Sequence, residues 1–347
     1  MHHGQSTISV QSLRSLGHGL KRPECALAHS SGYVFTPDWR GSGGISAIAP
    51  NGDVAFLGAK NPPRPLRPNG IALEPDGCFL LADLGETLGG VWRLHPDGAV
   101  EPVLTQIGSQ PLPPTNFVLR DAQGRLWITV STRKVPRDLG YRRDVADGFI
   151  VLVDRGSARI VADNLGYANE CLLSADERHL YVNETFARRL SRFSVLQGTG
   201  LGPRETVAEF AEGVFPDGLA LDADGGIWIT SIVSNRVLRI DRAGRMEVVI
   251  EDCAADHVAW VEQAYTAGTL GRPHLDRAAG KRLRNISNLA FGGAGLRTGY
   301  LGCLLGDALF TFDSPVAGHP PSHWGVPLGA LAPAIANQLL PRSGASS

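Results

Sequence analysis

The feature that most constrains this chain is an internal repeat. Six segments each open with a polar residue, continue as a short apolar strand, turn at a Gly-rich stretch and return as a second apolar strand. Four copies are plain, for example PNGIALEPDGCFLLAD from Pro68 and PDGLALDADGGIWITS from Pro216, and weaker copies begin at Pro23 and Ser287. Antiparallel strands repeated at intervals of about 40–50 residues are the signature of propeller blades.

The repeat therefore predicts an all-β fold, a six-bladed β-propeller that forms a single domain over residues 1–347. The first strands of successive units lie 45, 47, 53, 48 and 71 residues apart. Turn sequences such as EPDG and DADG separate the apolar runs, as in β-hairpins. The predicted blades are centred on residues 24–53, 69–98, 116–157, 169–195, 217–245 and 288–315.

Two long inserts interrupt the repeat, at residues 132–147 and 252–286. Alternation of strand direction places both on the face where the first strands begin. The second insert carries Val258, Val261, Ala264 and Tyr265 at helical spacing, which predicts a short helix between blades five and six. We expect both inserts to act like lids. His257 is a candidate substrate contact, although a loop histidine is more often only a solvated side chain.

Composition narrows the possible partners. Hydrophobic residues make up 43% of the chain and charged residues 19%, with a formal net charge of −1. These values predict a folded protein with no nucleic-acid, membrane or obligate protein partner, and a small molecule as its substrate. The five cysteines are widely spaced and form no CxxC pair, and the first residues lack the pattern of a signal peptide. We therefore expect a cytoplasmic protein with free thiols.

One position in each unit points to chemistry. The residue that opens the first strand is an acid or an amide in all six copies: Glu24, Asn69, Asn116, Asn169, Asp217 and Asn288. First strands line the channel of a propeller, so these side chains should converge on its axis. Asn and Asp also favour strand starts because they cap turns, but this preference does not explain the glutamate. Oxygen ligands without His or Cys favour one hard divalent cation, Ca²⁺ first, with Mg²⁺, Mn²⁺ or Zn²⁺ possible.

These motifs resemble the gluconolactonase and regucalcin family (senescence marker protein 30-like), which is related to diisopropyl fluorophosphatase. The resemblance spans roughly residues 20 to 315. It rests on PECA at Glu24, ANECLLSAD at Asn169, PDGLALDADGGIW at Asp217 and TNFVLRDAQGRLW at Asn116. It implies that Glu24, Asn169 and Asp217 bind the metal, with Asn116 binding metal or substrate. Three positions depart from the family: Pro114 stands where sugar-lactone members usually have arginine, and Phe117 and Glu170 also differ.

The sequence thus predicts a metal-dependent hydrolase, most simply a lactonase that opens a small, possibly anionic lactone. Asp217 is the candidate base or nucleophile and Glu170 a candidate acid or base. Asn69, Asn116 and Asn288 would orient substrate oxygens, and basic residues in both inserts would attract an anion. The alternatives are hydrolysis of another electrophile, such as a phosphoester, phosphofluoridate or cyclic ketone, at the same cation, and a non-enzymatic binding propeller.

Overall fold

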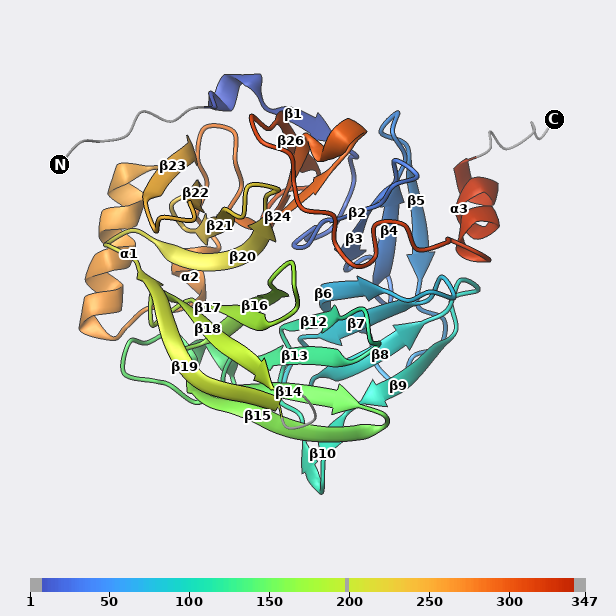
Figure 1. The fold of residues 1–347 in the computed structure, drawn as a ribbon, viewed down its shortest axis with the longest axis horizontal. Coiled ribbons are helices and arrows are strands. Elements are labelled where there is room, and N and C mark those ends of the chain that lie inside the picture. The colour runs from blue at the N-terminus through green and yellow to red at the C-terminus, as the bar shows by residue number, and fades with distance from the viewer. Residues whose placement is uncertain (1–7, 197–199, 340–347) are drawn as a thin grey trace.

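The computed structural model describes residues 8–196 and 200–339. Within these ranges, six four-stranded antiparallel sheets are arranged around a central axis (Figure 1), which confirms the six-bladed β-propeller. Each predicted unit supplies three strands of a blade. The fourth, outermost strand was not part of the repeat pattern, because outer strands carry mixed polar and apolar residues.

The strands of the first three blades follow one another in chain order. They are β2 (Leu27–Ala28), β3 (Val34–Asp38), β4 (Gly44–Ile48) and β5 (Val54–Gly58); β6 (Pro68–Leu73), β7 (Phe79–Asp83), β8 (Gly90–Leu94) and β9 (Val100–Leu104); and β12 (Phe117–Arg120), β13 (Leu126–Val130), β14 (Gly148–Asp154) and β15 (Ser157–Leu165). A small hairpin, β10 (Gln106–Ile107) and β11 (Gln110–Pro111), projects between blades two and three.

The remaining blades close the ring. They are β16 (Ala168–Leu173), β17 (His179–Glu184), β18 (Arg189–Leu196) and β19 (Gly200–Glu209); β20 (Phe215–Leu221), β21 (Ile227–Ile232), β22 (Arg236–Ile240) and β23 (Met246–Glu251); and β24 (Ile286–Gly292), β25 (Thr298–Cys303), β26 (Leu309–Asp313) and β1 (Arg14–Leu16). The outer strand of the last blade therefore comes from the N-terminal segment, with Ser15 paired to Phe310. This pairing joins the two ends of the chain and covers an open sheet edge.

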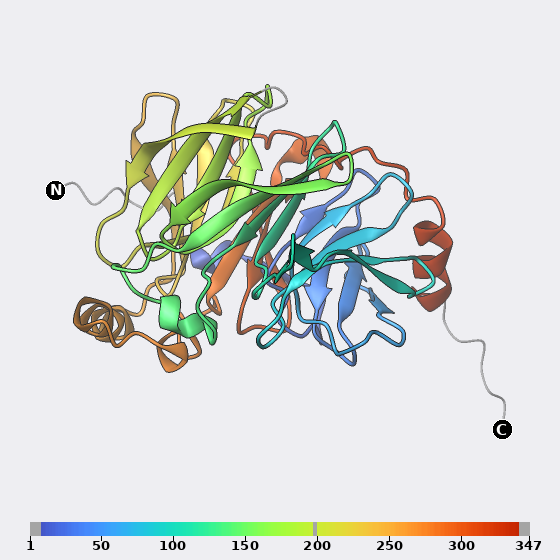
Figure 2. The same ribbon diagram turned by 90° about the horizontal axis from the view of Figure 1, so that it is seen from below.

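Helices are confined to the connections. The 3-10 helices are η1 (Val10–Ser12), η2 (Arg137–Gly140) and η3 (Ala294–Leu296), and the α-helices are α1 (Ala255–Ala267), α2 (Arg272–Leu275) and α3 (Leu331–Leu339). α1, α2 and η2 lie on one face of the propeller, whereas the segment after β26 crosses the other face (Figure 2). α3 packs Leu331 and Ile335 against the first blade. No helix in the described ranges is both long and apolar enough to cross a bilayer.

The turn motif that repeats in the sequence has a direct structural role. Asp222 accepts hydrogen bonds from the backbone N–H of Gly226 (2.7 Å) and from Nε1 of the fully buried Trp228 (2.9 Å). Nε of Arg239 donates to the same carboxylate at 2.8 Å. Burial opposes ionisation of Asp222, but these hydrogen bonds outweigh it and lower the pKa of the carboxyl. Asp121 binds the indole of Trp127 in the same way in blade three.

Replacing Asp222 by alanine should therefore be costly. Asp222→Ala leaves the Trp228 N–H and the Arg239 guanidinium without their acceptor, and we expect a loss of about 3 kcal/mol in the free energy of unfolding. The matched control is Asp241→Ala, which removes a turn acceptor of the same blade near the surface and should cost less than about 1 kcal/mol. Urea denaturation of both variants checks this, and equal losses would contradict the role of Asp222.

Candidate functional site

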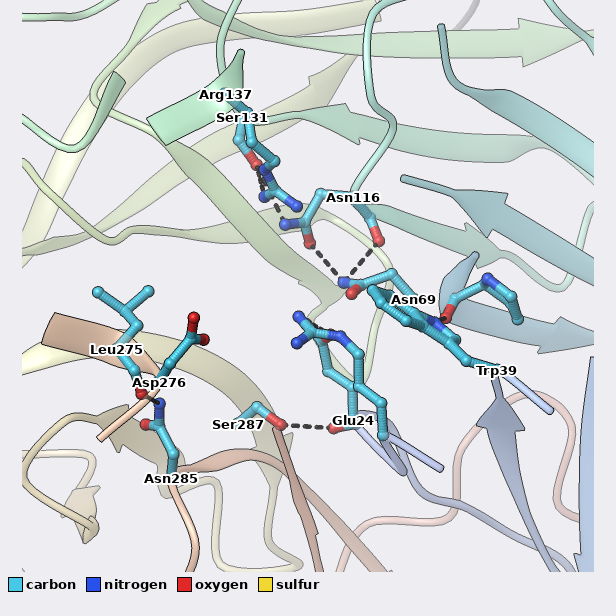
Figure 3. Close-up of polar contacts among 12 residues, drawn as sticks. Glu24, Trp39, Asn69, Asn116, Ser131, Arg137, Leu275, Asp276, Asn285 and Ser287 are labelled. Carbon is cyan, nitrogen blue, oxygen red and sulfur yellow. Dashed lines mark hydrogen bonds and ion pairs between the residues drawn. The ribbon is translucent and has the colours of Figure 1, made fainter. Parts of the chain in front are cut away.

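The six polar positions lie together at one end of the central channel. All six side chains are buried, with exposed fractions of 6% or less: Glu24, Asn69, Asn116, Asn169, Asp217 and Asn288. They come from the starts of the six innermost strands, so every blade contributes one residue. Figure 3 shows three of them, Glu24, Asn69 and Asn116, around a shared space. Asn288 lies deeper in the channel, as described below, and we call the other five residues the polar ring.

β-Bulges present several of these side chains to the axis. Pairing between β6 and β7 skips from Pro68 to Ile71, so Asn69 and Gly70 stand outside the regular ladder. The same irregularity occurs around Asn169 in β16 and around Asp217 in β20. A bulge breaks the strict alternation of a strand and re-aims its side chains, and bulges are common beside active sites. The bulges explain how residues at strand starts turn inward.

The asparagine amides of the ring are held by their nitrogen atoms. Nδ2 of Asn116 donates to Oγ of Ser131 (3.1 Å), and Nδ2 of Asn169 donates to Oγ1 of Thr185 (3.1 Å). Nδ2 of Asn69 donates to the carbonyl oxygen of Asn116 at 3.1 Å. The Oδ1 atoms of Asn69 and Asn169 are buried and accept no hydrogen bond from the described residues. Buried acceptors without a partner are rare, so these oxygens are available to a bound group.

The two carboxylates of the ring differ in their surroundings. Glu24 forms an ion pair with Arg22, Nη2 to Oε2 2.9 Å, whose guanidinium also lies 4.6 Å from the centre of the Trp39 ring. Asp217 accepts no side-chain hydrogen bond from the described residues. Burial, and then the charges of Glu24 and Glu170, raise the pKa of Asp217 well above its ordinary value. A positive charge placed next to Asp217 would therefore favour the ionised form of its carboxyl group.

The donors of the ring fit a hard cation. The carboxylates of Glu24 and Asp217 and the amides of Asn69 and Asn169 all offer oxygen atoms as ligands. Ca²⁺ binds such mixed sets of carboxylate and amide oxygens in irregular geometry. The described residues contain no group of three or more His, Cys, Asp or Glu side chains placed to hold a metal. Any cation at this site would therefore depend on asparagine oxygens, as the sequence pattern predicted.

Glu170 and Asn288 occupy a different place from the other candidates. Oε1 of Glu170 accepts from Nδ2 of Asn288 (2.8 Å), and Oε2 accepts from the backbone N–H of Leu219 (3.0 Å). Oδ1 of Asn288 accepts from the N–H of Ala26 at 2.7 Å. Burial raises the pKa of Glu170 to about 8. Both side chains are thus tied into the channel wall below the ring, and their proposed parts in catalysis and substrate binding stay predictions.

The helical insert forms as predicted, but its position requires a correction. α1 packs Val261, Ala264 and Tyr265 against the aromatic residues of blades four and five, and it lies at the edge of the propeller rather than across the channel mouth (Figure 1). Its apolar face is used for this packing, which fixes the helix away from the axis. His257 lies beside Trp260 at a ring distance of 5.5 Å, and the structure does not bring it into the polar ring. Figure 3 shows Leu275 and Asp276, at the end of α2, together with Asn285 of the same insert, on the side of the site occupied by Ser287.

Sequence reasoning missed three residues that shape the site, Arg22, Ser131 and Thr185, and it indicated Arg137 only as one of several basic residues in the first insert. Arg137, from the first insert, donates through Nε to Oη of Tyr167 (2.8 Å) and through Nη2 to Oγ of Ser131 (3.3 Å). Ser131 and Thr185 both follow second strands of their blades. Aligning the second strands as well as the first would have shown this recurring hydroxyl. No sequence pattern signals Arg22, and the basic run of the first insert does not distinguish Arg137 from its neighbours.

The fold and the site define the class of this protein: a β-propeller with an oxygen-lined site at one end of its central channel. A comparison of its sequence with known families then identifies the family. Residues 56–261 match the SMP-30/Gluconolactonase/LRE-like region. The chain belongs to this family, as the motifs indicated. The lactonase drp35 of Staphylococcus saprophyticus is 27% identical over 184 residues, which cover 51% of this chain and 54% of that protein. The lactonase drp35 of Staphylococcus epidermidis is 24% identical over 189 residues, with the same coverage. The chain thus matches about half the length of these relatives.

Solved structures show the same fold. A gluconolactonase from Xanthomonas campestris superposes with a TM-score of 0.64 and 19% identity, over 87% of this chain and 89% of that one. A calcium-binding protein, regucalcin, from Agrobacterium tumefaciens superposes with a TM-score of 0.60 and 17% identity, over 90% and 94% of the two chains. At such identities the similarity establishes the propeller architecture and leaves the chemistry to the residues of the site.

The raised pKa of Asp217 gives a test of cation binding. In the absence of metal, the folded state holds the Asp217 proton more tightly than the unfolded state does. Its contribution to stability therefore falls as the pH rises above about 4, the ordinary aspartate value. Asp217→Asn removes this loss of stability, because the asparagine side chain does not ionise. In chelator at pH 7 the variant should melt higher than the wild type, by about 2 °C for each kcal/mol gained.

Excess Ca²⁺ should make the wild type melt higher than Asp217→Asn, because a cation that binds only the folded wild type stabilises it by mass action. The difference in Tm between wild type and variant, followed from pH 4 to pH 8 with and without Ca²⁺, isolates Asp217 from the other titrating groups. A difference that responds to neither pH nor Ca²⁺ would argue against a cation at the polar ring.

Proposed function

We propose that this chain is a metal-dependent lactonase whose reaction takes place at the polar ring. The observation that carries this proposal is a pair of buried amide oxygens, on Asn69 and Asn169, that accept no hydrogen bond from the part of the chain that the structure describes, together with the buried carboxyl of Asp217. Membership of the SMP-30/gluconolactonase family supports it. A divalent cation held by Glu24, Asn169 and Asp217 would polarise an ester carbonyl and stabilise negative charge on its oxygen.

The remaining chemistry belongs to residues of the chain. With its carboxyl ionised, Asp217 takes a proton from the attacking water, the role of a general base. Asn69 and Asn116 lie within hydrogen-bonding distance of each other. Their amide groups orient the oxygen atoms of the lactone substrate. Because the site is buried in the channel, bulk water is largely excluded and these contacts gain strength.

Arg137 points to an anionic substrate. It forms none of the ion pairs between described residues, and it is fixed instead by two hydroxyl groups, those of Tyr167 and Ser131. Ser131 is also the hydrogen-bond acceptor for Asn116, so the guanidinium stands next to the ring. The family resemblance places an arginine two residues before Asn116, where this chain has Pro114. Arg137 thus brings a positive charge to the same neighbourhood from a different element.

A panel of lactones assayed with and without chelator tests the catalytic part of the proposal. We expect hydrolysis that is lost in excess chelator and restored by Ca²⁺ or another divalent cation. Asp217→Asn should lower kcat by about 10² or more, the usual cost of removing a general base. Hydrolysis that is indifferent to chelator would contradict metal dependence. Lack of hydrolysis of any lactone by the metal-loaded protein would favour the other electrophiles or a binding function.

The part played by Arg137 has a separate test. Arg137→Met should lower kcat/KM for 5-oxotetrahydrofuran-2-carboxylate by about 10- to 100-fold, the value of a charge-assisted contact. It should leave γ-butyrolactone, which lacks the carboxylate, nearly unchanged. Arg142→Met, which removes a surface arginine of the same insert paired to Asp144, is the matched control. Equal losses on both substrates would show that Arg137 acts only through the structure of the loop.

A further inference from the structure

The central channel has a second end with different chemistry. Beyond the polar ring, all six inner strands continue with mainly apolar residues, and these line a cavity of about 270 Å³. The segments that contribute are residues 26–28, 71–73, 118–120, 171–173, 219–221 and 289–291. Glu24, Asn69, Asn116, Asn169 and Asp217 are not among its lining residues. The channel is thus divided into the polar ring and what we call the apolar chamber.

A tightly packed layer separates the two. Asn288 and Glu170, bonded to each other, form the inner end of the apolar chamber. The ring of Phe117 lies against Gly70 so closely that a Cβ atom on that glycine would come within 2.4 Å of it. A Cβ atom on Gly218 would meet the backbone of Asn288 at 2.6 Å. Larger residues at these two glycines would not fit, because the inner strands of neighbouring blades pack tightly at this level. We call this level of the channel, between the polar ring and the apolar chamber, the partition.

The outer end of the chamber is partly covered by residues 319–323, which follow the last strand and cross the face opposite α1 (Figure 2). Three hydrogen bonds hold this strap to the ends of three inner strands. The N–H of His319 donates to the carbonyl of Leu221 (2.8 Å) in blade five. Oγ of Ser322 donates to the carbonyl of Arg120 (2.9 Å) in blade three, and Nε2 of His323 donates to that of Ala28 (3.1 Å) in blade one.

The chamber is suited to an organic molecule rather than to water. A buried water needs two to four polar partners, which the apolar strand residues of the wall do not supply, whereas an apolar cavity of about 150 Å³ in another protein binds benzene. Polar side chains, among them Arg120, Asp121 and Glu177, come from strand ends and turns. The carboxyl of Glu170 is the polar group at the inner end, and both of its described partners, Leu219 N–H and Asn288 Nδ2, are donors. Each oxygen keeps a second lone pair that can accept a hydrogen bond.

We propose that the apolar chamber is a second small-molecule site, which binds an uncharged, largely apolar molecule bearing one hydroxyl group directed at Glu170. A hydroxyl can donate to this carboxyl or accept from it, so the contact forms in either protonation state. A carboxylate on the ligand would place a charge among apolar side chains, with no cationic side chain of the described residues lining the inner end, and is disfavoured. The proposal does not depend on lactonase activity, because the chamber and the polar ring lie on opposite sides of the partition.

Fluorescence titration with 2-naphthol tests the proposal on the whole chain. We expect saturable binding of one 2-naphthol per chain, about five- to tenfold tighter than that of 2-methylnaphthalene, which lacks the hydroxyl. 2-Naphthoate should bind at least tenfold more weakly than 2-naphthol. Failure of 2-naphthol to bind saturably would overturn the proposal, and so would equal or tighter binding of 2-naphthoate.

Variants locate the bound molecule. Ala290→Phe adds bulk at a chamber-lining position of β24 and should weaken 2-naphthol binding at least tenfold. Ala162→Phe, the same change on the outer strand β15, should leave it unaltered. Glu170→Leu should remove the preference for 2-naphthol over 2-methylnaphthalene. A preference that survives this change would refute the assignment of Glu170.

A further variant does not depend on how well Ala290→Phe folds. Asp217→Asn replaces a side chain that does not line the apolar chamber, although the charges of Asp217 and Glu170 influence each other. Because the hydroxyl contact forms in either protonation state of Glu170, the variant should keep 2-naphthol binding within about threefold of the wild type, whether or not the ring proves catalytic. Loss of binding in Asp217→Asn would place the molecule at the polar end of the channel and overturn the proposal. Lactonase assays of the same variant report on the proposed function independently.

Discussion

The convergence of six strands on one narrow channel is the constraint on which the rest of this structure depends. Each blade contributes its innermost strand in the same direction, so residues that are far apart in the chain meet when they hold equivalent positions. Glu24 and Asp217 become neighbours in this way, and the charge of Glu24 raises the pKa of Asp217. The convergence requires a closed ring, which the pairing of β1 with β26 completes.

Burial of acidic groups in this channel is electrostatically unfavourable unless positive charge is near. Arg22 meets part of this need at Glu24. Asp217 forms no ion pair with the described residues. The charges of Arg137 and Arg22 act on it, but burial and the neighbouring carboxyl groups outweigh them and raise its pKa. Natural sites tolerate such a cost where it serves binding or catalysis. The same reasoning connects the free amide oxygens of Asn69 and Asn169 to a bound group, since buried acceptors are otherwise satisfied within the protein.

The division of the channel gives one fold two chemically distinct chambers. The polar end is framed by residues at bulges, and the apolar end by regular strand residues and a strap from the C-terminal segment. Glu170 and Asn288 lie at the boundary, where they bond to each other and to the backbone of neighbouring blades. Their role in holding the partition is structural, whatever they contribute to chemistry on either side.

The sequence by itself determined the propeller, the number of blades and the set of six polar positions, because a repeat reports equivalent places in a symmetric fold. It also indicated the helix at Ala255–Ala267 through its apolar spacing. Only the tertiary structure decided where that helix lies, since its apolar face fits the aromatic residues of blades four and five. Arg137, Arg22 and the strap came from outside the repeat, so no internal comparison could place them. The sequence repeat shows only the features that all six blades share. Contacts between segments outside the repeat form only when the folded ring brings those segments together.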